Sequence, residues 1–373
     1  MGEPRTVRTL GVAAVGRPEL FSYVEQPPAD GEVRLDTLFT GLSAGTELTV
    51  LKGTNPYLHS SWDAERGVFR AGEPSTSFPV EVLGYMESAV VVESRNDAVP
   101  EGQVVAAAYG HRTGHVVDPA AQVLIPLPPD LDPLLGVYVA QMGPICANGL
   151  LHAAADRLGA DPGLALGDGV RGQRVLVTGA GVVGLLTGLL ASVHGAADVV
   201  LADPDPARLA VAAELGLTPL LDDSPEAVWE WCSSRWRHGA ADSGADVTFQ
   251  CRGQAHVLAT ALRSTRPQGS IIDLAFYQGG APDLRLGEEF HHKGMTLRCA
   301  QINRVPRGLA GTWDRRRLAA ETLALLAERG DAVRRHVVTD VVPFDAGPAL
   351  MTELAELRRP TVSAVFAVDG SSA

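Results

Sequence analysis

The run VLVTGAGVVG at residues 175–184, with Asp203 at the end of the next apolar stretch, constrains this chain more than any other feature. The apolar residues predict a strand that leads Gly179 into a tight turn. Gly181 then lets the backbone approach a pyrophosphate, and Gly184 lets the following helix pack closely on the strand. The N-terminus of that helix attracts phosphates, and Asp203 can accept hydrogen bonds from ribose hydroxyls. The pattern predicts a dinucleotide-binding unit.

The acid also predicts which dinucleotide binds. A 2′-phosphate beside Asp203 would meet a carboxylate, so we expect NAD rather than NADP. Arg208 follows closely in the sequence, and this cation keeps NADP as the alternative. The residues expected to form the dinucleotide site are Gly179, Gly181, Val183, Gly184, Asp203, Arg208, Cys251, Leu274 and Phe276.

Length and charge limit the class of protein. The 373 residues are enough for two domains, each with its own core. The net charge of −13 and the absence of a basic arm argue against a nucleic-acid partner. The first residues lack the apolar segment of a secretory signal, so we expect a cytoplasmic protein. The long apolar run at 175–201 is broken by glycines and His194, so we expect no membrane span.

The four cysteines are dispersed and form no C-x-x-C pair. This spacing predicts reduced thiols rather than a disulfide framework or a zinc ribbon. The cysteines are Cys146, Cys232, Cys251 and Cys299.

The chain changes character near residue 150. Before it, short β-type runs separated by Gly and Pro predict a barrel-like antiparallel domain, interrupted by a polar, aromatic-bearing loop at 54–77. After it, alternating strands and helices predict a doubly wound parallel sheet. An amphipathic helix is expected at 315–330, ending at a glycine cap, and the tail returns to strands that rejoin the first domain. The expected domains are 1–148 plus 302–373, β-rich, and 149–301, dinucleotide-binding.

Several motifs carry a family resemblance. GLSAGTE at 41–47, GYM at 84–86 and GAGVVG at 179–184, in this order, resemble the medium-chain alcohol dehydrogenase/reductase superfamily over nearly the whole chain. TNPYL and LGEEFHHKGMTLR are similar to a narrower branch with a GISAGTE-type motif, whose members are poor in metal ligands. The resemblance implies an α/β fold with a Rossmann sheet and a GroES-like barrel, and a homodimer joined at its sheet edges.

The departures from the zinc-binding pattern bear on mechanism. Zinc-containing members hold the metal with a Cys in C-G-x-D/E, a His in G-H-E and a later Cys or acid. Here Ala44 and Tyr85 stand at the first two positions, and Cys146 falls only loosely near the third. One thiolate cannot replace the three protein ligands of a catalytic zinc, and no cysteine precedes Cys146 to form a structural zinc lobe. We therefore expect no zinc.

Four residues are candidates for proton transfer in the first domain. Thr46 aligns with the proton-relay hydroxyl of the superfamily. Tyr85 either points its phenol at the substrate or fills the space that zinc would occupy. Glu47 follows the relay position and either acts directly or only holds the turn. Glu87 lies two residues beyond Tyr85, on the same face of a regular strand, as a base or as a solvent-facing charge.

His291 and His292 are further candidates, because imidazoles transfer protons near neutral pH. Two adjacent histidines cannot both face one pocket, so at most one acts, and a structural polar pair is the alternative; we retain His291 as the catalytic candidate. His111, His115 and His152 have no spacing that suggests a metal, and we interpret them as ordinary residues.

The leading interpretation is a zinc-independent NAD oxidoreductase acting on a hydroxyl or carbonyl of a small polar metabolite, with specialised metabolism as one setting. The loop at 54–77 would cover the substrate. An NADPH-dependent ene or quinone reductase is the alternative enzyme. A non-catalytic NAD-binding protein is the alternative outside enzymes.

Overall fold

The computed structural model describes residues 2–282 and 284–368. It divides into two compact units, the first formed by Met1–Gln141 with Val338–Ala373 and the second by Met142–Val337. The sequence analysis put these boundaries at 148/149 and 301/302. The boundary near 148 moves to 141 because a helix begins at Met142 and packs in the second unit. The boundary near 301 moves to 337 because the long helix at Arg315–Ala332 also packs in the second unit.

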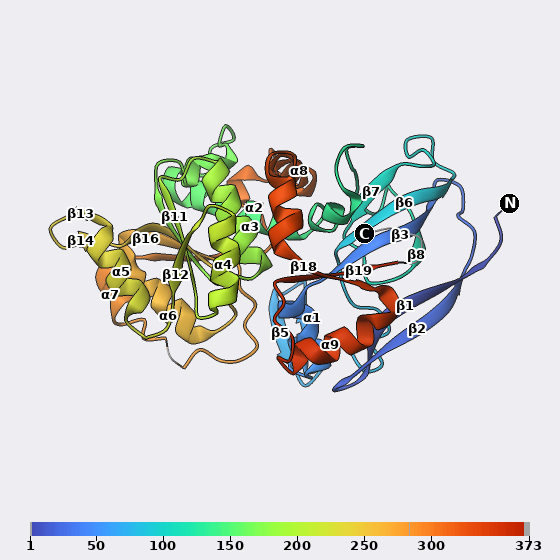
Figure 1. Cartoon of the computed structure of the whole chain (residues 1–373), viewed down its shortest axis with the longest axis horizontal. Coiled ribbons are helices and arrows are strands. Elements are labelled where there is room, and N and C mark those ends of the chain that lie inside the picture. The colour runs from blue at the N-terminus through green and yellow to red at the C-terminus, as the bar shows by residue number, and fades with distance from the viewer. Residues whose placement is uncertain (1, 283, 369–373) are drawn as a thin grey trace. The chain divides into compact units, whose positions relative to one another are not determined.

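The first unit is β-rich. Its strands are β1 (Arg5–Ala14), β2 (Arg17–Glu25), β3 (Val33–Leu42), β4 (Ser60–Asp63), β5 (Val68–Ala71), β6 (Glu87–Ser94), β7 (Val104–Ala107), β8 (Gly114–Val117), β9 (Leu124–Pro126), β18 (Val338–Pro343) and β19 (Ser363–Ala367). Its helices are α1 (Ala44–Leu51) and α9 (Gly347–Ala355), with short 3-10 turns η1 (Pro56–Leu58), η2 (Pro133–Tyr138) and η6 (Phe344–Ala346). The tail strands β18 and β19 join this unit, as expected (Figure 1).

The larger sheet of this unit runs in the order β18-β19-β3-β6-β7-β9, and β8 also pairs with β3. Because side chains alternate between the two faces of a strand, Val33 and Leu35 of β3 point to the same face. There they pack in one core cluster with Ala89 and Val91 of β6. Strands β3, β6 and β7 are antiparallel neighbours. The end of β3 and the end of β7 therefore both lie beside the start of β6.

Part of the expected polar loop at 54–77 is a hairpin. Strands β4 and β5 pair antiparallel within it. Tyr57, Trp62 and Phe69 form a contiguous aromatic group, with ring centroids 5.6 Å apart for Tyr57 and Phe69 and 5.2 Å for Trp62 and Phe69. All three rings are more than 40% exposed in this chain. Cross-strand aromatic pairing gave this segment an ordered structure that its polar composition did not predict.

The second unit is a parallel α/β layer. Its strands are β10 (Arg174–Thr178), β11 (Asp198–Asp203), β12 (Thr218–Leu221), β13 (Arg237–Gly239), β14 (Asp242–Ser243), β15 (Ala245–Gln250), β16 (Thr265–Asp273) and β17 (Thr296–Cys299). Its helices are α2 (Met142–Leu158), α3 (Val182–Val193), α4 (Pro206–Glu214), α5 (Ala227–Arg235), α6 (Ala255–Ser264), α7 (Glu289–Lys293) and α8 (Arg315–Ala332), with η3 (Leu166–Gly169), η4 (Arg307–Leu309) and η5 (Val333–Val337).

The parallel sheet has the order β12-β11-β10-β15-β16-β17, so the direction of winding reverses between β10 and β15. Strand β10 contains a continuous buried apolar run, because helix α3 packs on it and Leu176 lies in a core cluster with Val228 and Cys232 of α5. Figure 1 shows helices α3 to α6 packed against this sheet. The expected doubly wound sheet with a β-rich companion domain is confirmed.

Two local expectations need comment. Helix α8 does not end at its glycine: it passes through Gly330 to Ala332 and continues as the π-helical turn η5. Gly330 is buried there, so packing outweighed its tendency to end a helix. Within the described ranges, no helix combines the length and hydropathy needed to cross a membrane.

Candidate active site

The glycine turn has the geometry that its sequence predicted. Gly179 follows β10 with a φ of +108°, a region that favours glycine. A Cβ at Gly184 would overlap the carbonyl oxygen of Gly179, so this position admits no side chain. At Gly181 the nearest atom to a Cβ would be Nη1 of Arg208, at 3.9 Å, which leaves the backbone open. Helix α3 begins directly after Gly181, so its free N–H groups lie at this turn.

Asp203 ends β11 beside that turn. One carboxylate oxygen accepts the N–H of Ala180 at 2.8 Å, and the other accepts the N–H of Asp205 at 2.9 Å. Each oxygen keeps a lone pair for another donor, such as a ribose hydroxyl. The guanidinium of Arg208 lies 3.6 Å from the Asp205 carboxylate. Backbone contacts therefore orient the carboxylate, and a cation is close by.

The remaining expected cofactor residues follow the next parallel strands. The N–H of Cys251 donates to the Thr178 carbonyl, and the N–H of Leu274 donates to the Gln250 carbonyl, both at 2.9 Å. Burial raises the pKa of the Cys251 thiol well above its usual value. Phe276 is 39% exposed. These positions lie at the carboxyl ends of β15 and β16, where parallel α/β sheets bind ligands.

A hydrogen-bonded network not anticipated from the sequence joins these strand ends. The Thr178 hydroxyl donates to the side-chain oxygen of Gln250, and the Gln250 amide lies 3.2 Å from the Tyr277 hydroxyl. That hydroxyl donates to Asp273 at 2.9 Å. Burial raises the pKa of the Asp273 carboxyl, against the hydrogen bonds from Ala275 and Tyr277. The network ties β10, β15 and β16 together at the edge of the sheet.

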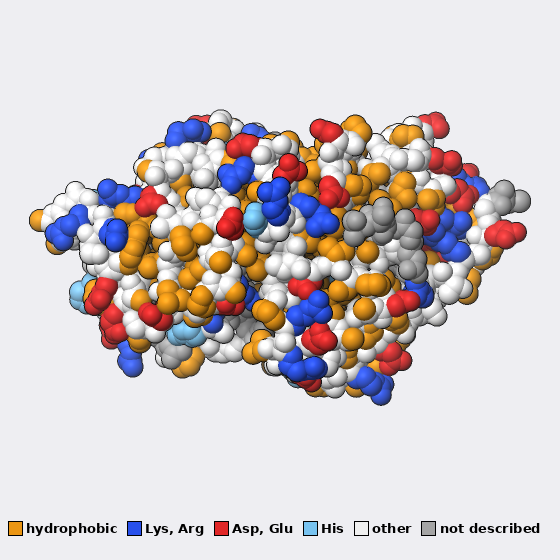
Figure 2. Space-filling view, viewed as in Figure 1, with side chains coloured by type: hydrophobic (Ala, Val, Ile, Leu, Met, Phe, Trp, Pro, Cys, Tyr) orange, Lys and Arg blue, Asp and Glu red, His pale blue; other side chains and the backbone are white. Residues whose placement is uncertain are grey.

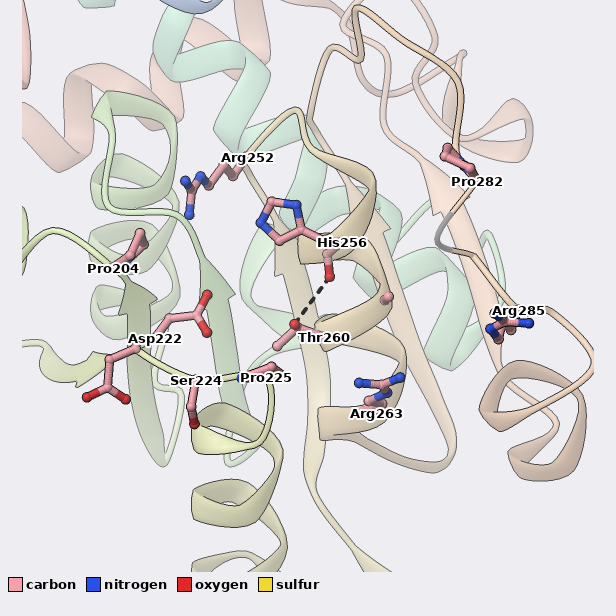
Figure 3. Close-up of a pocket in the computed structure, with 12 residues that line it drawn as sticks. Pro204, Asp222, Ser224, Pro225, Arg252, His256, Thr260, Arg263, Pro282 and Arg285 are labelled. Atoms are coloured by element: carbon pink, nitrogen blue, oxygen red, sulfur yellow. Dashed lines mark hydrogen bonds between the residues drawn. The ribbon is translucent and has the colours of Figure 1, made fainter. Parts of the chain in front are cut away.

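A pocket of about 560 Å³ opens in the same unit. Arg252, in the loop before α6, and His256, in the first turn of α6, face the loop that carries Asp222 (Figure 3). Burial raises the pKa of the Asp222 carboxyl, and the charges of Arg252 and His256 oppose that shift. Pro204, the residue after Asp203, also lines the pocket. The pocket thus adjoins the strand end that carries the predicted ribose-binding acid.

In the first unit, Tyr85 lies in a cluster of hydroxyls. Its hydroxyl donates to Ser43 Oγ and lies 3.4 Å from Thr46 Oγ1. Ser43 and Thr46 follow β3 and Tyr85 precedes β6, so the antiparallel pairing of these strands brings the three together. Burial raises the pKa of the Tyr85 phenol; the hydrogen bonds to Ser43 and Thr46 oppose this shift, and the charge of Glu47 adds to it.

Glu47 does not contact the phenol through a hydrogen bond. One oxygen of its carboxylate accepts the N–H of Ser43 at 2.7 Å, and the other lies 2.6 Å from Nε2 of His111. The opposite ring nitrogen of His111 lies 2.7 Å from the Thr40 hydroxyl. Glu47 is 3% exposed and His111 is fully buried. The sequence analysis interpreted His111 as an ordinary residue because its spacing suggests no metal; its carboxylate partner Glu47 lies 64 residues away.

Glu87 belongs to a separate cluster. Its carboxylate accepts the Thr37 hydroxyl at 2.5 Å and lies 2.7 Å from Nε2 of His115. The His115 ring stacks on Tyr109, with centroids 3.8 Å apart. Glu87 is fully buried rather than facing solvent, and its hydrogen bonds in the described structure go to Thr37 and His115 rather than to Tyr85.

His291 and His292 are exposed on α7, with their rings 5.6 Å apart. Helix α7 packs on α6, and Lys293 donates to the carbonyls of Arg263 and Thr265 at the end of α6. The segment therefore caps a helix, and a catalytic role for His291 stays a prediction.

The residues at the superfamily's metal positions do not fit zinc. Ala44 offers no donor atom, and the Tyr85 hydroxyl is engaged with Ser43. Both ring nitrogens of His111 are already engaged by Glu47 and Thr40. Cys146 is fully buried, and its thiol donates to the carbonyl of Val183. Across residues 2–282 and 284–368, no three His, Cys, Asp or Glu side chains are grouped to hold a metal.

Sequence comparison matches part of the chain to dehydrogenases. The zinc-binding dehydrogenase family matches residues 182–313. D-xylulose reductase from Saccharomyces cerevisiae is 35% identical over 109 residues, which are 29% of this chain and 30% of that enzyme. The chain thus matches less than a third of the length of this curated relative.

Solved structures align over nearly the whole chain. Alcohol dehydrogenase from Thermotoga maritima covers 98% of this chain and is itself covered completely, with a TM-score of 0.73 and 14% identity. A Sinorhizobium meliloti 1021 protein bound to NADP covers 97% of this chain, and 99% of it is covered, with a TM-score of 0.70 and 19% identity.

The fold is thus that of a dehydrogenase-type protein, with a nucleotide-binding type of parallel sheet and a β-rich companion domain. The family match over residues 182–313, the partial match to D-xylulose reductase and the shared fold support the resemblance to the medium-chain dehydrogenase/reductase superfamily seen in the motifs.

Proposed function

We propose that this protein is a zinc-independent, NAD-linked oxidoreductase that interconverts a hydroxyl and a carbonyl on a small polar metabolite. The observation that carries the proposal is the Tyr85 phenol, held between the hydroxyls of Ser43 and Thr46 at the position where zinc-binding members carry a histidine. The match to D-xylulose reductase supports a polar, hydroxylated substrate. A cytoplasmic homodimer stays a prediction.

The second unit supports dinucleotide binding. The open backbone at Gly181 and the start of α3 suit a pyrophosphate, and the Asp203 carboxylate suits a ribose diol. A pocket of about 560 Å³ beside Pro204 is within the usual size range of ligand sites and has room for the adenosine half. NAD, when bound, supplies a two-electron acceptor for hydride. Arg208 is a nearby cation that would weaken the preference for NAD over NADP.

The hydroxyl cluster supports the proton step. Oxidation of an alcohol removes a hydride from carbon and a proton from oxygen, and reduction returns both. Because burial raises its pKa, the Tyr85 phenol stays protonated at neutral pH, and its O–H can turn from Ser43 Oγ to donate a hydrogen bond to a substrate oxygen. In reduction, the oxygen takes its proton through the Tyr85 hydroxyl or Thr46 Oγ1. In oxidation, the substrate proton passes to one of these hydroxyl oxygens as that hydroxyl releases its own proton toward water, so each hydroxyl ends neutral.

One experiment tests the proposal against both alternatives. NADH and NADPH binding is measured by calorimetry, and turnover is measured on polyols, sugar ketones, activated alkenes and quinones. We expect NADH binding with turnover of hydroxyl or ketone substrates. NADPH-dependent turnover of the alkenes or quinones alone would establish the ene or quinone reductase instead. Tight binding without turnover on any of them would favour a non-catalytic protein.

The same preparation tests zinc independence. With Ala44 and Tyr85 at the first two metal positions, we expect far less than one zinc per chain, and chelators should change neither turnover nor folding. Stoichiometric zinc by elemental analysis, lost together with activity on chelation, would overturn this part of the proposal.

A further inference from the structure

His111 touches both segments that carry the hydroxyl cluster. Its backbone N–H donates to the Leu83 carbonyl at 2.6 Å, two residues before Tyr85. Its ring meets Glu47 of helix α1 at 2.6 Å. The imidazole also packs edge-on against Phe366, with ring centroids 5.1 Å apart. One buried residue therefore connects the segment before β6 with the helix after β3.

Glu47 links His111 to the hydroxyl cluster of Ser43, Thr46 and Tyr85. Its second carboxylate oxygen accepts the N–H of Ser43 at 2.7 Å, across the first turn of α1. This bond fixes the backbone of Ser43, whose Oγ accepts the Tyr85 hydroxyl. A carboxylate at a helix N-terminus is also favoured by the helix dipole. Thr40 completes the chain by bonding the other nitrogen of His111.

The backbone leaves room for His111 at Gly84. This residue has a φ of +94°, and a Cβ there would lie 2.8 Å from Cε1 of the imidazole. Gly84 directly precedes Tyr85. The imidazole is thus packed against the peptide that leads into the phenol, in addition to its hydrogen bond to Glu47.

We propose that His111 is a positioning residue, which acts through Glu47 and Ser43 to hold the Tyr85 hydroxyl in register with Thr46. The inference rests on the proposed function, because it gives that cluster a reaction to serve. His111 itself stays buried behind Glu47 and does not touch the substrate. A displacement of about 1 Å at a reacting group can cost about 100-fold in rate, so a loose His111 side chain matters even at this remove.

The first unit contains a matched control. Thr37, Glu87 and His115 form a second buried chain with the same residue types and the same Nε2-to-carboxylate contact, at 2.7 Å. His115 is 1% exposed, so its removal disturbs a core as buried as that around His111. The hydrogen bonds of this chain do not reach Ser43, Thr46 or Tyr85 in the described structure. The two histidines therefore separate positioning from general packing.

The experiment compares His111→Asn with His115→Asn. Asparagine shortens the side chain and withdraws the donor from each glutamate. We expect His111→Asn to lower kcat by about 100-fold with the KM for NADH within about threefold, and His115→Asn to keep kcat within about threefold while losing a similar amount of thermal stability. His111→Gln, which can still donate to Glu47, should recover part of kcat and serves if the asparagine variant does not fold.

A readout without turnover separates this inference from the proposed function. In protein with 13C-labelled tyrosine, the Tyr85 ring resonance, assigned with Tyr85→Phe, should shift in His111→Asn and stay in place in His115→Asn. A shift without any substrate turnover would leave the positioning role standing and the proposed function in doubt. If the parent protein turns over substrate and the folded His111 variants change neither the Tyr85 resonance nor kcat, the positioning role is overturned. The proposed function then stands. Equal effects of both histidine variants would also overturn it.

Discussion

The two candidate binding regions use different parts of the chain. In the second unit, main-chain geometry dominates: the left-handed Gly179, the close approach of Gly184 to Gly179, and the free N–H groups at the start of α3. In the first unit, side chains dominate, because Tyr85, Ser43 and Thr46 meet through their hydroxyls. The buried Glu47 side chain bonds the backbone of Ser43 and the ring of His111.

The difference predicts how each region responds to substitution. A site made of backbone is sensitive to added atoms, since a new Cβ cannot be accommodated where peptides touch. A site made of side chains is sensitive to removed atoms, since a single hydroxyl carries the chemistry. Substitutions in the second unit should therefore alter dinucleotide affinity or stability, and substitutions in the hydroxyl cluster should alter turnover.

The visible surface carries mixed charges, which agrees with the proposal that the ligands are small molecules. In the view of Figure 2, Lys and Arg side chains alternate with Asp and Glu side chains.

The largest effect is expected at Tyr85. Tyr85→Phe keeps the ring and removes the hydroxyl, so turnover should fall by about 100- to 10,000-fold, the usual contribution of acid–base groups. NADH affinity should stay within about threefold, because the phenol serves the reacting oxygen. Thr46→Val should act in the same direction. Steady-state kinetics and calorimetry check both variants. Full activity of Tyr85→Phe would mean that Tyr85 only packs, and that Glu47 or His291 transfers the proton.

Two glycine substitutions sharpen the backbone side of the comparison. Gly184→Ala places a methyl group on the Gly179 carbonyl, so the free energy of unfolding should fall by about 1–3 kcal/mol or more. Gly181→Ala enters open space at a φ of −78°, so stability should change by less than about 0.5 kcal/mol while NADH affinity falls. Denaturant unfolding and calorimetry separate the two. Unchanged NADH affinity in Gly181→Ala would remove the pyrophosphate from this turn.

A smaller effect is expected for dinucleotide choice. The Asp203 carboxylate should favour NAD(H) over NADP(H) by at least tenfold, or about 1.4 kcal/mol. Asp203→Gly should narrow that ratio, since it removes both the acceptor for the diol and the repulsion of a 2′-phosphate. Competition binding with both dinucleotides measures the ratio. Equal affinities in the parent protein would contradict the assignment of Asp203.

The smallest effect concerns His152, which supports the fold of the second unit. Burial lowers the pKa of His152 below its ordinary 6.5, although the hydrogen bond to the Arg304 carbonyl opposes the shift. The unfolded chain then binds more protons, so the stability from neutral His152 is complete above pH 6.5 and is lost as the pH falls toward the folded pKa. His152→Gln should flatten this decline in denaturant unfolding at several pH values. Parallel pH curves for both proteins would contradict it.

Much of the fold follows from short-range patterns. The strand, turn and helix around Gly179 are contiguous, and each glycine has a local reason to be there, so the parallel unit was predicted closely. The aromatic hairpin at 60–71 was missed because its composition is polar and its order comes from pairing across strands. The continuation of α8 through Gly330 was missed because burial of that residue decided it.

The hydroxyl cluster could be predicted only in part. The resemblance pointed to Thr46, Tyr85 and Glu47, but nothing in the sequence pairs Glu47 with His111, 64 residues away, or Glu87 with His115. In the structure, His111 lies between β7, which pairs with β6, and β8, whereas His115 lies within β8, which pairs with β3. The sequence by itself determined the glycine turn at 179–184, because a turn depends on neighbouring residues. The tertiary structure decided the partners of the buried carboxylates, because antiparallel pairing of distant strands brings together donors and acceptors that must be satisfied away from water.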